Sequence, residues 1–167
     1  MKGSNYRIGN GMPLTRKEYT SSPNTRIARF NTGNPKNDYD VRVSLTSNEV
    51  SQIRDNAIEA ARVAANKKMF VVGETNYHLN VKIYPHVILS ENKMIATAGA
   101  DRLQEGMRRA YGKPSGLASR VKIGQKILEI RTFKHNIDAA KKALKSAGSK
   151  LPMPSKVLIE EVIQSKK

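Results

Sequence analysis

The chain contains no cysteine and no tryptophan, and only 5% of its residues are aromatic. Without cysteine it can form neither a disulfide framework nor a thiolate zinc site, and its three histidines are not spaced as metal ligands. No apolar run approaches the roughly 20 residues that a helix needs to cross a bilayer. The few aromatic residues argue against a sheet that stacks RNA bases on exposed rings. These absences predict a cytoplasmic protein with no cofactor, no metal and no membrane contact.

Positive charge is what the chain has in excess. Its 167 residues include 30 lysines and arginines against 14 aspartates and glutamates, which gives a net charge of +16. The excess lies at the amino terminus, in a glycine-rich stretch at 93–124 and in the carboxy-terminal third. Such charge opposes compaction by self-repulsion, and a polyanionic partner offsets it. The composition therefore predicts a packed centre with basic extensions that bind nucleic acid.

The pattern of apolar residues predicts the α+β class. Residues 1–26 combine glycine, proline and cations without periodicity, which indicates an extended basic arm. Residues 27–167 are expected to form one compact domain, with two main helices packed on a mixed or antiparallel sheet. Strands are predicted at 41–45, 79–83, 87–89 and 156–163, and a hairpin is predicted to turn at Gly124.

Two segments have helical periodicity. The first is predicted to begin at a capping box formed by Thr46 and Glu49, to run to about Met69 and to stop before Gly73. The second is predicted over 137–147, with Asn136 as its cap. Lysines on the outer face of this second helix, among them Lys141 and Lys145, fit a solvated surface and an RNA-facing surface equally well.

Motifs for catalysis are not apparent. The stretch from Gly106 to Lys113 differs from a P-loop, because five residues separate its glycines and a proline follows the lysine. His78 and His86 are interpreted as ordinary hydrogen-bonding histidines, and His135 as a phosphate or backbone contact. No paired carboxylates suited to a metal-dependent nuclease are evident. An enzyme is therefore not predicted.

Cations are concentrated in the glycine-rich stretch. Six of them fall within 21 residues, namely Arg102, Arg108, Arg109, Lys113, Arg120 and Lys122. Asp101 is a candidate cap for a short helix there, and Gly112 and Gly116 would let the backbone approach a bound ligand closely. A mobile surface loop is the alternative interpretation, which the density of cations makes less attractive.

Ten blocks of sequence, in the same order, resemble the archaeal L-ten-e branch of a large-subunit ribosomal protein family whose bacterial counterpart is L-sixteen. The resemblance covers residues 13–160. The blocks are PLTRKEY (13–19), IRDNAIEAARVAAN (53–66), YHL (77–79), YPH (84–86), ENKM (91–94), AGADR (98–102), GMR (106–108), GKP (112–114), RVKIGQ (120–125) and KLPMP (150–154). The sequence departs from the family pattern at Ser90, where arginine is frequent, and at Asp55, where histidine is frequent.

The resemblance implies a structural protein of the large ribosomal subunit that binds rRNA near 5S rRNA and the central protuberance, beside tRNA and neighbouring ribosomal proteins. It also implies a hammerhead-like body, with an internal loop at 96–116 that points toward the peptidyl transferase centre. The expected rRNA contacts are Arg7, Arg16, Lys17, Arg26, Arg29, Lys93, Arg120, Lys122, Lys141 and Lys145. The expected loop residues near tRNA are Arg102, Arg108, Arg109, Gly112, Lys113 and Gly116.

Two other functional classes are compatible with the composition. An RNA-acting enzyme would need a cluster of acids or histidines in a cleft and would show turnover on a defined RNA. A basic DNA-binding architectural protein would bind duplex DNA as tightly as rRNA.

Overall fold

The computed structural model describes residues 2–9, 15, 18–93 and 106–161. A five-stranded sheet has the order β1-β4-β7-β2-β8, and a three-stranded sheet has the order β3-β6-β5. All the described strand pairs are antiparallel. The first sheet consists of β1 (Asn31–Gly33), β2 (Val41–Ser47), β4 (Tyr77–Val81), β7 (Lys126–Thr132) and β8 (Ser155–Glu161). The second consists of β3 (Ser51–Arg54), β5 (Val87–Glu91) and β6 (Lys113–Val121).

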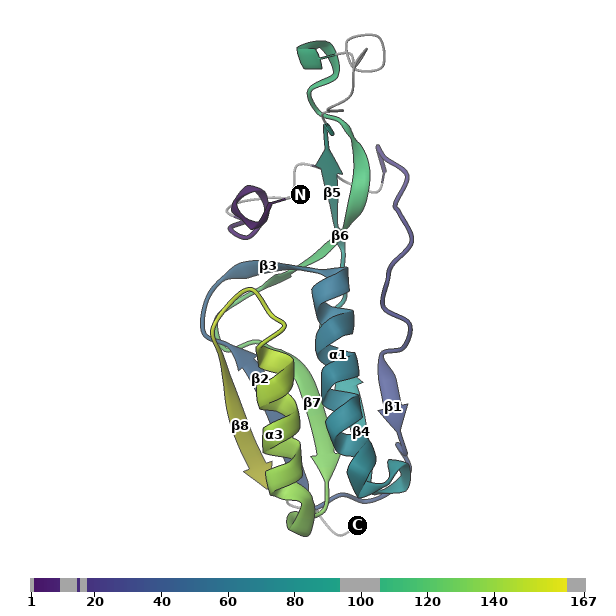
Figure 1. Ribbon diagram of the computed structural model, residues 1–167, viewed down its shortest axis with the longest axis vertical. Coiled ribbons are helices and arrows are strands. Elements are labelled where there is room, and N and C mark those ends of the chain that lie inside the picture. Colours follow the sequence, from purple (N-terminus) through teal and green to yellow (C-terminus); the bar gives the residue numbers. More distant parts are fainter. Residues whose placement is uncertain (1, 10–14, 16–17, 94–105, 162–167) are drawn as a thin grey trace.

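Two α-helices, α1 (Asp55–Met69) and α3 (Ile137–Gly148), lie side by side over one face of the five-stranded sheet (Figure 1). Strands β5 and β6 extend away from this body as a long hairpin. Short 3-10 helices occupy Gly3–Asn5, Phe70–Val72, Glu74–Asn76, Gly106–Arg109 and Lys134–Asn136. None of the described helices is long and apolar enough to span a membrane.

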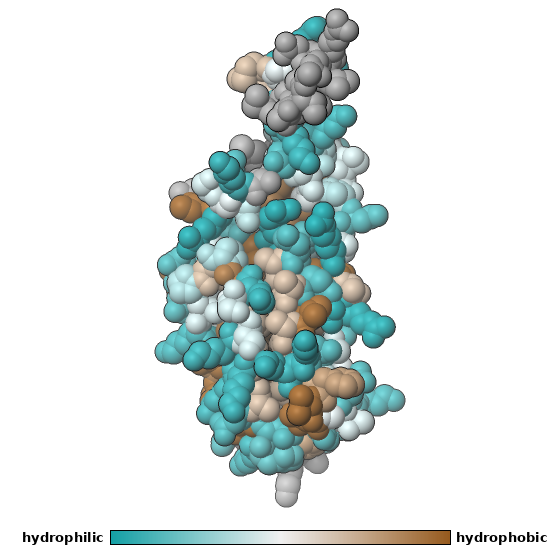
Figure 2. All heavy atoms as spheres, in the orientation of Figure 1, coloured by the Kyte–Doolittle hydropathy of each residue, from teal (hydrophilic) through white to brown (hydrophobic). Residues whose placement is uncertain are grey.

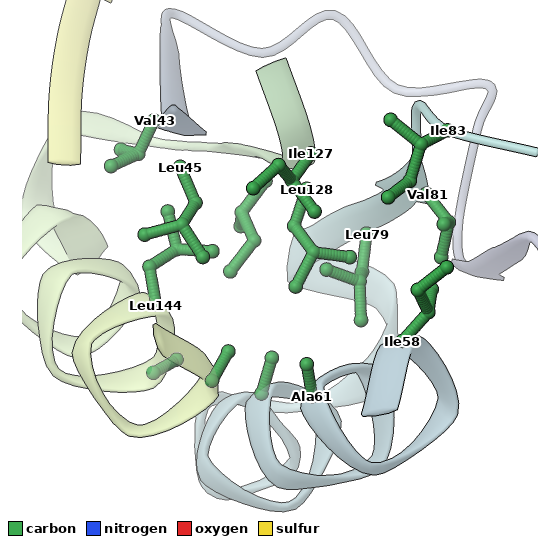
Figure 3. Packing of buried hydrophobic residues seen from close by; sticks show 14 of the residues in the cluster. Val43, Leu45, Ile58, Ala61, Leu79, Val81, Ile83, Ile127, Leu128 and Leu144 are labelled. Atoms are coloured by element: carbon green, nitrogen blue, oxygen red, sulfur yellow. The ribbon is translucent and has the colours of Figure 1, made fainter. Parts of the chain in front are cut away.

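The core lies between the helices and the sheet. Val43 and Leu45 of β2 and Leu128 of β7 point toward helix residues such as Ala61 and Leu144 (Figure 3). Alanines are fully buried on the facing sides of both helices, and their small side chains let the helices pack closely against each other and the sheet. The predicted α+β class and the two main helices are confirmed.

The predicted start of the first helix is wrong. Strand β2 runs to Ser47, residues 51–54 form β3, and the helix begins only at Asp55. The Thr46 hydroxyl donates a hydrogen bond to the Lys156 carbonyl and caps no helix. Residues 51–54 are extended because they pair with β6, and a pairing partner so distant in sequence overrides local helical periodicity.

The predicted hairpin at Gly124 is also wrong. Strand β6 pairs with β3 and β5, whereas β7 pairs with β2 and β4, so the turn carries the chain from one sheet to the other. Gly124 has a φ of 76°, which favours glycine, and its amide donates to the Ser47 carbonyl. The bend between β2 and β3 thus lies against this turn.

The other predicted helix and strands agree with the structure to within a few residues, whereas β1 and the first half of β6 were not predicted. The helix predicted at 137–147 is α3, although no side-chain hydrogen bond from Asn136 caps it. The strands predicted at 79–83 and 87–89 correspond to β4 and β5. The last predicted strand corresponds to β8, and its positions 162–163 lie outside the described residues.

Candidate nucleic-acid interface

Exposed cations gather at the far end of the β5–β6 hairpin. Glu91 pairs with Lys113 at the last described rung, and Lys93 follows β5. The 3-10 helix Gly106–Arg109 lies at the distal end and carries Arg108 and Arg109. All four cations are exposed, and Figure 2 shows hydrophilic side chains just below the grey residues at this end of the molecule. Within the described part of the chain, Lys93, Arg108 and Lys113 form no ion pair, which leaves their charge available to an external anion.

Gly112 closes the described end of the hairpin. It has a φ of 74°, and a Cβ at this position would overlap the backbone of Glu91 and Asn92. The Asn92 side chain donates a hydrogen bond to the Gly106 carbonyl, which holds the 3-10 helix against β5. Glycine at position 112 therefore allows the backbone contact that positions the nearby cations. Gly116 pairs with Leu89 and has no positive φ.

The first described residues of the amino-terminal segment lie against β3. The Arg7 carbonyl accepts a hydrogen bond from the Gln52 amide at 2.8 Å, and the Tyr6 carbonyl accepts one from the Gln52 side chain at 2.9 Å. The Arg54 guanidinium lies over the Tyr6 ring, 5.7 Å from its centroid. Further along, Thr15 and Tyr111 are joined through their hydroxyl groups. These contacts bring the segment to the hairpin.

The other expected RNA contacts are spread over the surface. Arg7 forms an ion pair with Glu49 at 3.2 Å. Arg120 of β6 lies opposite Gln52 of β3, and Lys122 is exposed in the turn between the two sheets. The remaining described ones, Arg26, Arg29, Lys141 and Lys145, are exposed. Arg16, Lys17 and Arg102, with the candidate cap Asp101, lie outside the described residues, as does the first part of the predicted loop, 96–105. The last residues of that predicted loop, 113–116, belong to strand β6. The structure therefore brings together only the hairpin subset.

A group of charges that the sequence did not predict surrounds the buried Glu129. The Glu129 carboxylate lies 2.9 Å from Arg131 Nε, 3.3 Å from Arg42 Nε and 3.4 Å from Lys82 Nζ. Burial alone would raise the pKa of Glu129, but the hydrogen bond from Arg131 and the charges of Lys82 and Arg42 outweigh it and lower the pKa. Glu129 and Arg131 alternate with apolar residues in the sequence, which indicates that both lie on one face of a strand. The sequence does not show that Arg42 and Lys82 also reach the Glu129 carboxylate.

His78 lies next to this group, opposite Arg131. Burial, reinforced by the positive charges of Arg131 and Lys82, lowers its pKa, so the imidazole is neutral near pH 7. No cluster of three or more potential metal ligands occurs among the described residues.

Comparison with known proteins identifies the family. The sequence matches the model of the family described as "Ribosomal protein L16p/L10e" over residues 2–158. The chain belongs to this family. A relative named large ribosomal subunit protein uL16, from Hyperthermus butylicus, is 52% identical over 151 residues, which cover 89% of this chain and 84% of the relative. Proteins of the same name from Staphylothermus marinus and Archaeoglobus fulgidus are 50% and 46% identical, covering 93% and 89% of this chain and 90% and 87% of theirs.

Membership of the L16p/L10e family confirms the resemblance seen in the sequence. Members of this family are structural ribosomal proteins, which removes the RNA-acting enzyme from consideration. A structural protein of the large ribosomal subunit associates with rRNA, a polyanion that complements the net charge of +16.

Proposed function

We propose that this L16p/L10e protein, a structural constituent of the large ribosomal subunit in the cytoplasm, binds rRNA through its exposed cations and positions tRNA with the end of the β5–β6 hairpin. The observation that carries the proposal is the hairpin itself. It extends beyond the folded body and presents Lys93, Arg108 and Lys113 without ion-pair partners in the described residues.

Electrostatics supports binding to the RNA backbone. Each phosphate that a lysine or arginine neutralises releases counterions and steepens the salt dependence of binding by about 0.7 to 0.9 log units per log unit of salt. A-form RNA hides its base edges in a deep, narrow groove, so we expect contacts to backbone and shape. The expected contacts are those named from the sequence, including Arg7, Arg26, Arg29, Arg120 and Lys122, with Arg16 and Lys17.

The finer placement rests on the resemblance of the sequence to its family. We propose that the hairpin, with the residues at 96–116 that complete it, points toward the peptidyl transferase centre and the aminoacyl-tRNA site, near 5S rRNA and the central protuberance. Arg102, Arg108, Arg109 and Lys113 are the cations assigned to this contact. Residues 1–26 are proposed to act as a separate basic arm on the domain formed by 27–167.

The test replaces Arg108, Arg109 and Lys113 together by alanine in large subunits. These side chains are exposed and contribute little to the core, so we expect normal folding and nearly normal subunit yield. Aminoacyl-tRNA binding and peptide-bond formation by the purified subunits should be reduced, because the lost cations are the ones assigned to that site.

A matched triple variant controls for the loss of three charges. Lys141, Lys142 and Lys145 are exposed on the outer face of α3, and their replacement by alanine should instead weaken retention of the protein in subunits at high salt. Wild-type tRNA binding and peptide-bond formation by the hairpin variant, at normal subunit yield, would refute the tRNA role.

A further inference from the structure

The face of the five-stranded sheet that points away from α1 and α3 is polar. Val43 and Leu45 are buried in the core, so Arg42 and Ser44 point to the opposite face. The strand register places residues in two rows across this face, which we call the open sheet face. One row is Gly33, His78, Arg131, Arg42 and Glu160, and the next is Asn31, Asn80, Glu129, Ser44 and Leu158.

Cations outnumber acids on the open sheet face. Arg42, Lys82 and Arg131 surround the carboxylate of Glu129. The carboxylate of Glu160 lies 2.8 Å from Lys126 Nζ and 4.0 Å from Arg42 Nη1. Four cations against two carboxylates leave a local net charge of +2. The side chains of Arg42, Lys82 and Arg131 are each about one-third exposed. The charged groups therefore lie close together, and their positive charge is only partly neutralised by the two carboxylates.

Hydrogen bonding on this face is incomplete. Arg42 Nε lies near Glu129 but has no hydrogen-bond partner among the described residues. Both ring nitrogens of His78 and the Ser44 hydroxyl are buried and also have no partner there. His78 is more than nine-tenths buried and Ser44 fully so. Buried polar groups without partners cost free energy, so a ligand that supplies acceptors at this face gains affinity.

We propose that the open sheet face is a second binding surface for rRNA phosphates, separate from the hairpin, with Arg42, Lys82 and Arg131 as its ligands. This inference rests on the proposed rRNA-binding function. A phosphate offers several acceptor oxygens to the planar guanidinium group. It can therefore bind an arginine more completely than a carboxylate that already contacts several cations.

The chemistry of the face favours the RNA backbone. Neither row contains phenylalanine, tyrosine or tryptophan, and the His78 ring is buried, so bases have no exposed ring to stack on. The excess positive charge complements phosphate, and the bidentate geometry of arginine recognises it. An acidic protein partner would satisfy the same charges, and the experiment below separates the two.

The experiment measures binding to protein-free large-subunit rRNA as a function of KCl concentration. The double variant R42Q/R131Q should lower the slope of log K against log salt by about 1.4 to 1.8, the value for two lost phosphate contacts. The single variant K82Q should lower it by about 0.7 to 0.9 and provides an independent test if the double variant folds poorly. Thermal melts of each protein establish that it is folded.

Two controls make the outcome specific. K67Q/K68Q removes two exposed cations at the end of α1, away from both proposed surfaces, and should leave the slope at its wild-type value. R42K/R131K keeps the charges and should restore most of the slope. Equal loss in the α1 control, or an unchanged slope in both R42Q/R131Q and K82Q, would overturn the proposal and exclude rRNA phosphate as the ligand of this face. A wild-type protein that fails to bind rRNA would overturn the rRNA-binding function as well.

Discussion

The two halves of strand β6 differ in burial: one half packs in the body and the other is exposed in the hairpin. Leu117, Ala118 and Val121 are buried where the strand joins the body, whereas Lys113 and Ser115 at its far end are exposed. In the body, apolar burial fixes the structure, and most cations near the sheet are held by acids such as Glu129. In the distal hairpin, backbone contacts and a glycine fix the structure, and the cations face solvent. Stability and RNA contact are therefore separable along one strand.

The largest effect is expected from a core deletion in the body. Ile130 on β7 is fully buried, and Ile130→Ala should reduce the free energy of unfolding by about 2–5 kcal/mol, because it removes apolar contacts and leaves a cavity. Met107 in the distal hairpin is 86% exposed, and Met107→Ala should change it by about 0.5 kcal/mol or less. Denaturant titration of both variants is the measurement. Equal destabilisation would contradict the division between body and hairpin.

The next effect is expected at the closed end of the hairpin. Gly112→Ala forces a Cβ into a positive-φ position against the backbone of Glu91 and Asn92, at a cost of about 1–3 kcal/mol. The distal hairpin can open locally without global unfolding, so hydrogen exchange at the amides of Asn92 and Lys113 is the sensitive measurement. Both should exchange faster.

Gly116 supplies the matched control for this substitution. A Cβ there would meet nothing closer than the Arg54 guanidinium at 3.9 Å, so Gly116→Ala should preserve exchange at both amides. Unchanged exchange in Gly112→Ala would show that the hairpin end does not depend on this glycine.

The same contrast explains what the sequence could reveal. Helix α3 was predictable because its buried positions, such as Ala140 and Leu144, recur at helical spacing within one short segment. The start of α1 was not predictable from the sequence, because Ser51–Arg54 forms a strand only through its pairing with β6, about 65 residues away in sequence. Local periodicity decides the first case, and long-range pairing decides the second.

The candidate site divides in the same way. Arg108, Arg109 and Lys113 are close in sequence, so their clustering was predictable from charge density. The ligands of the open sheet face come from β2, β7 and the residue after β4, and only the register brings Arg42 and Lys82 to Glu129. The contacts of Arg42 and Lys82 with Glu129 therefore cannot be predicted from the sequence without knowledge of the strand register.

A smaller effect is expected from removing the amino-terminal residues that cross between the two regions. Deletion of residues 1–9 removes two hydrogen bonds to Gln52, each worth about 0.5–1.5 kcal/mol, and an exposed Arg7–Glu49 pair that is worth little. The fold should persist with a loss of about 1–3 kcal/mol, while incorporation into subunits weakens. Denaturant titration and subunit incorporation are measured together. Complete unfolding would show that the arm is part of the domain.

The smallest effect concerns two acids of the body. The hydrogen bond from Arg62 lowers the pKa of Glu59, and the surrounding cations lower that of Glu129 despite its burial. Unfolded glutamate has a pKa of about 4.3, so the stabilisation from both acids is complete above that pH and is lost as the pH falls through their lower folded pKa values. The effect is modest because water screens the partners of Glu129, which are about one-third exposed.

Glu129→Gln and Glu59→Gln distinguish the two contributions. Each variant should show a flatter decline of unfolding free energy between pH 5 and 2 than the wild-type protein, because the lost group no longer takes up a proton on unfolding. The comparison is read from urea titrations at fixed salt, since added salt also screens the self-repulsion of the net charge of +16. If Glu129→Gln leaves the acid limb of the profile unchanged, the cations of the open sheet face are not held by that carboxylate in solution.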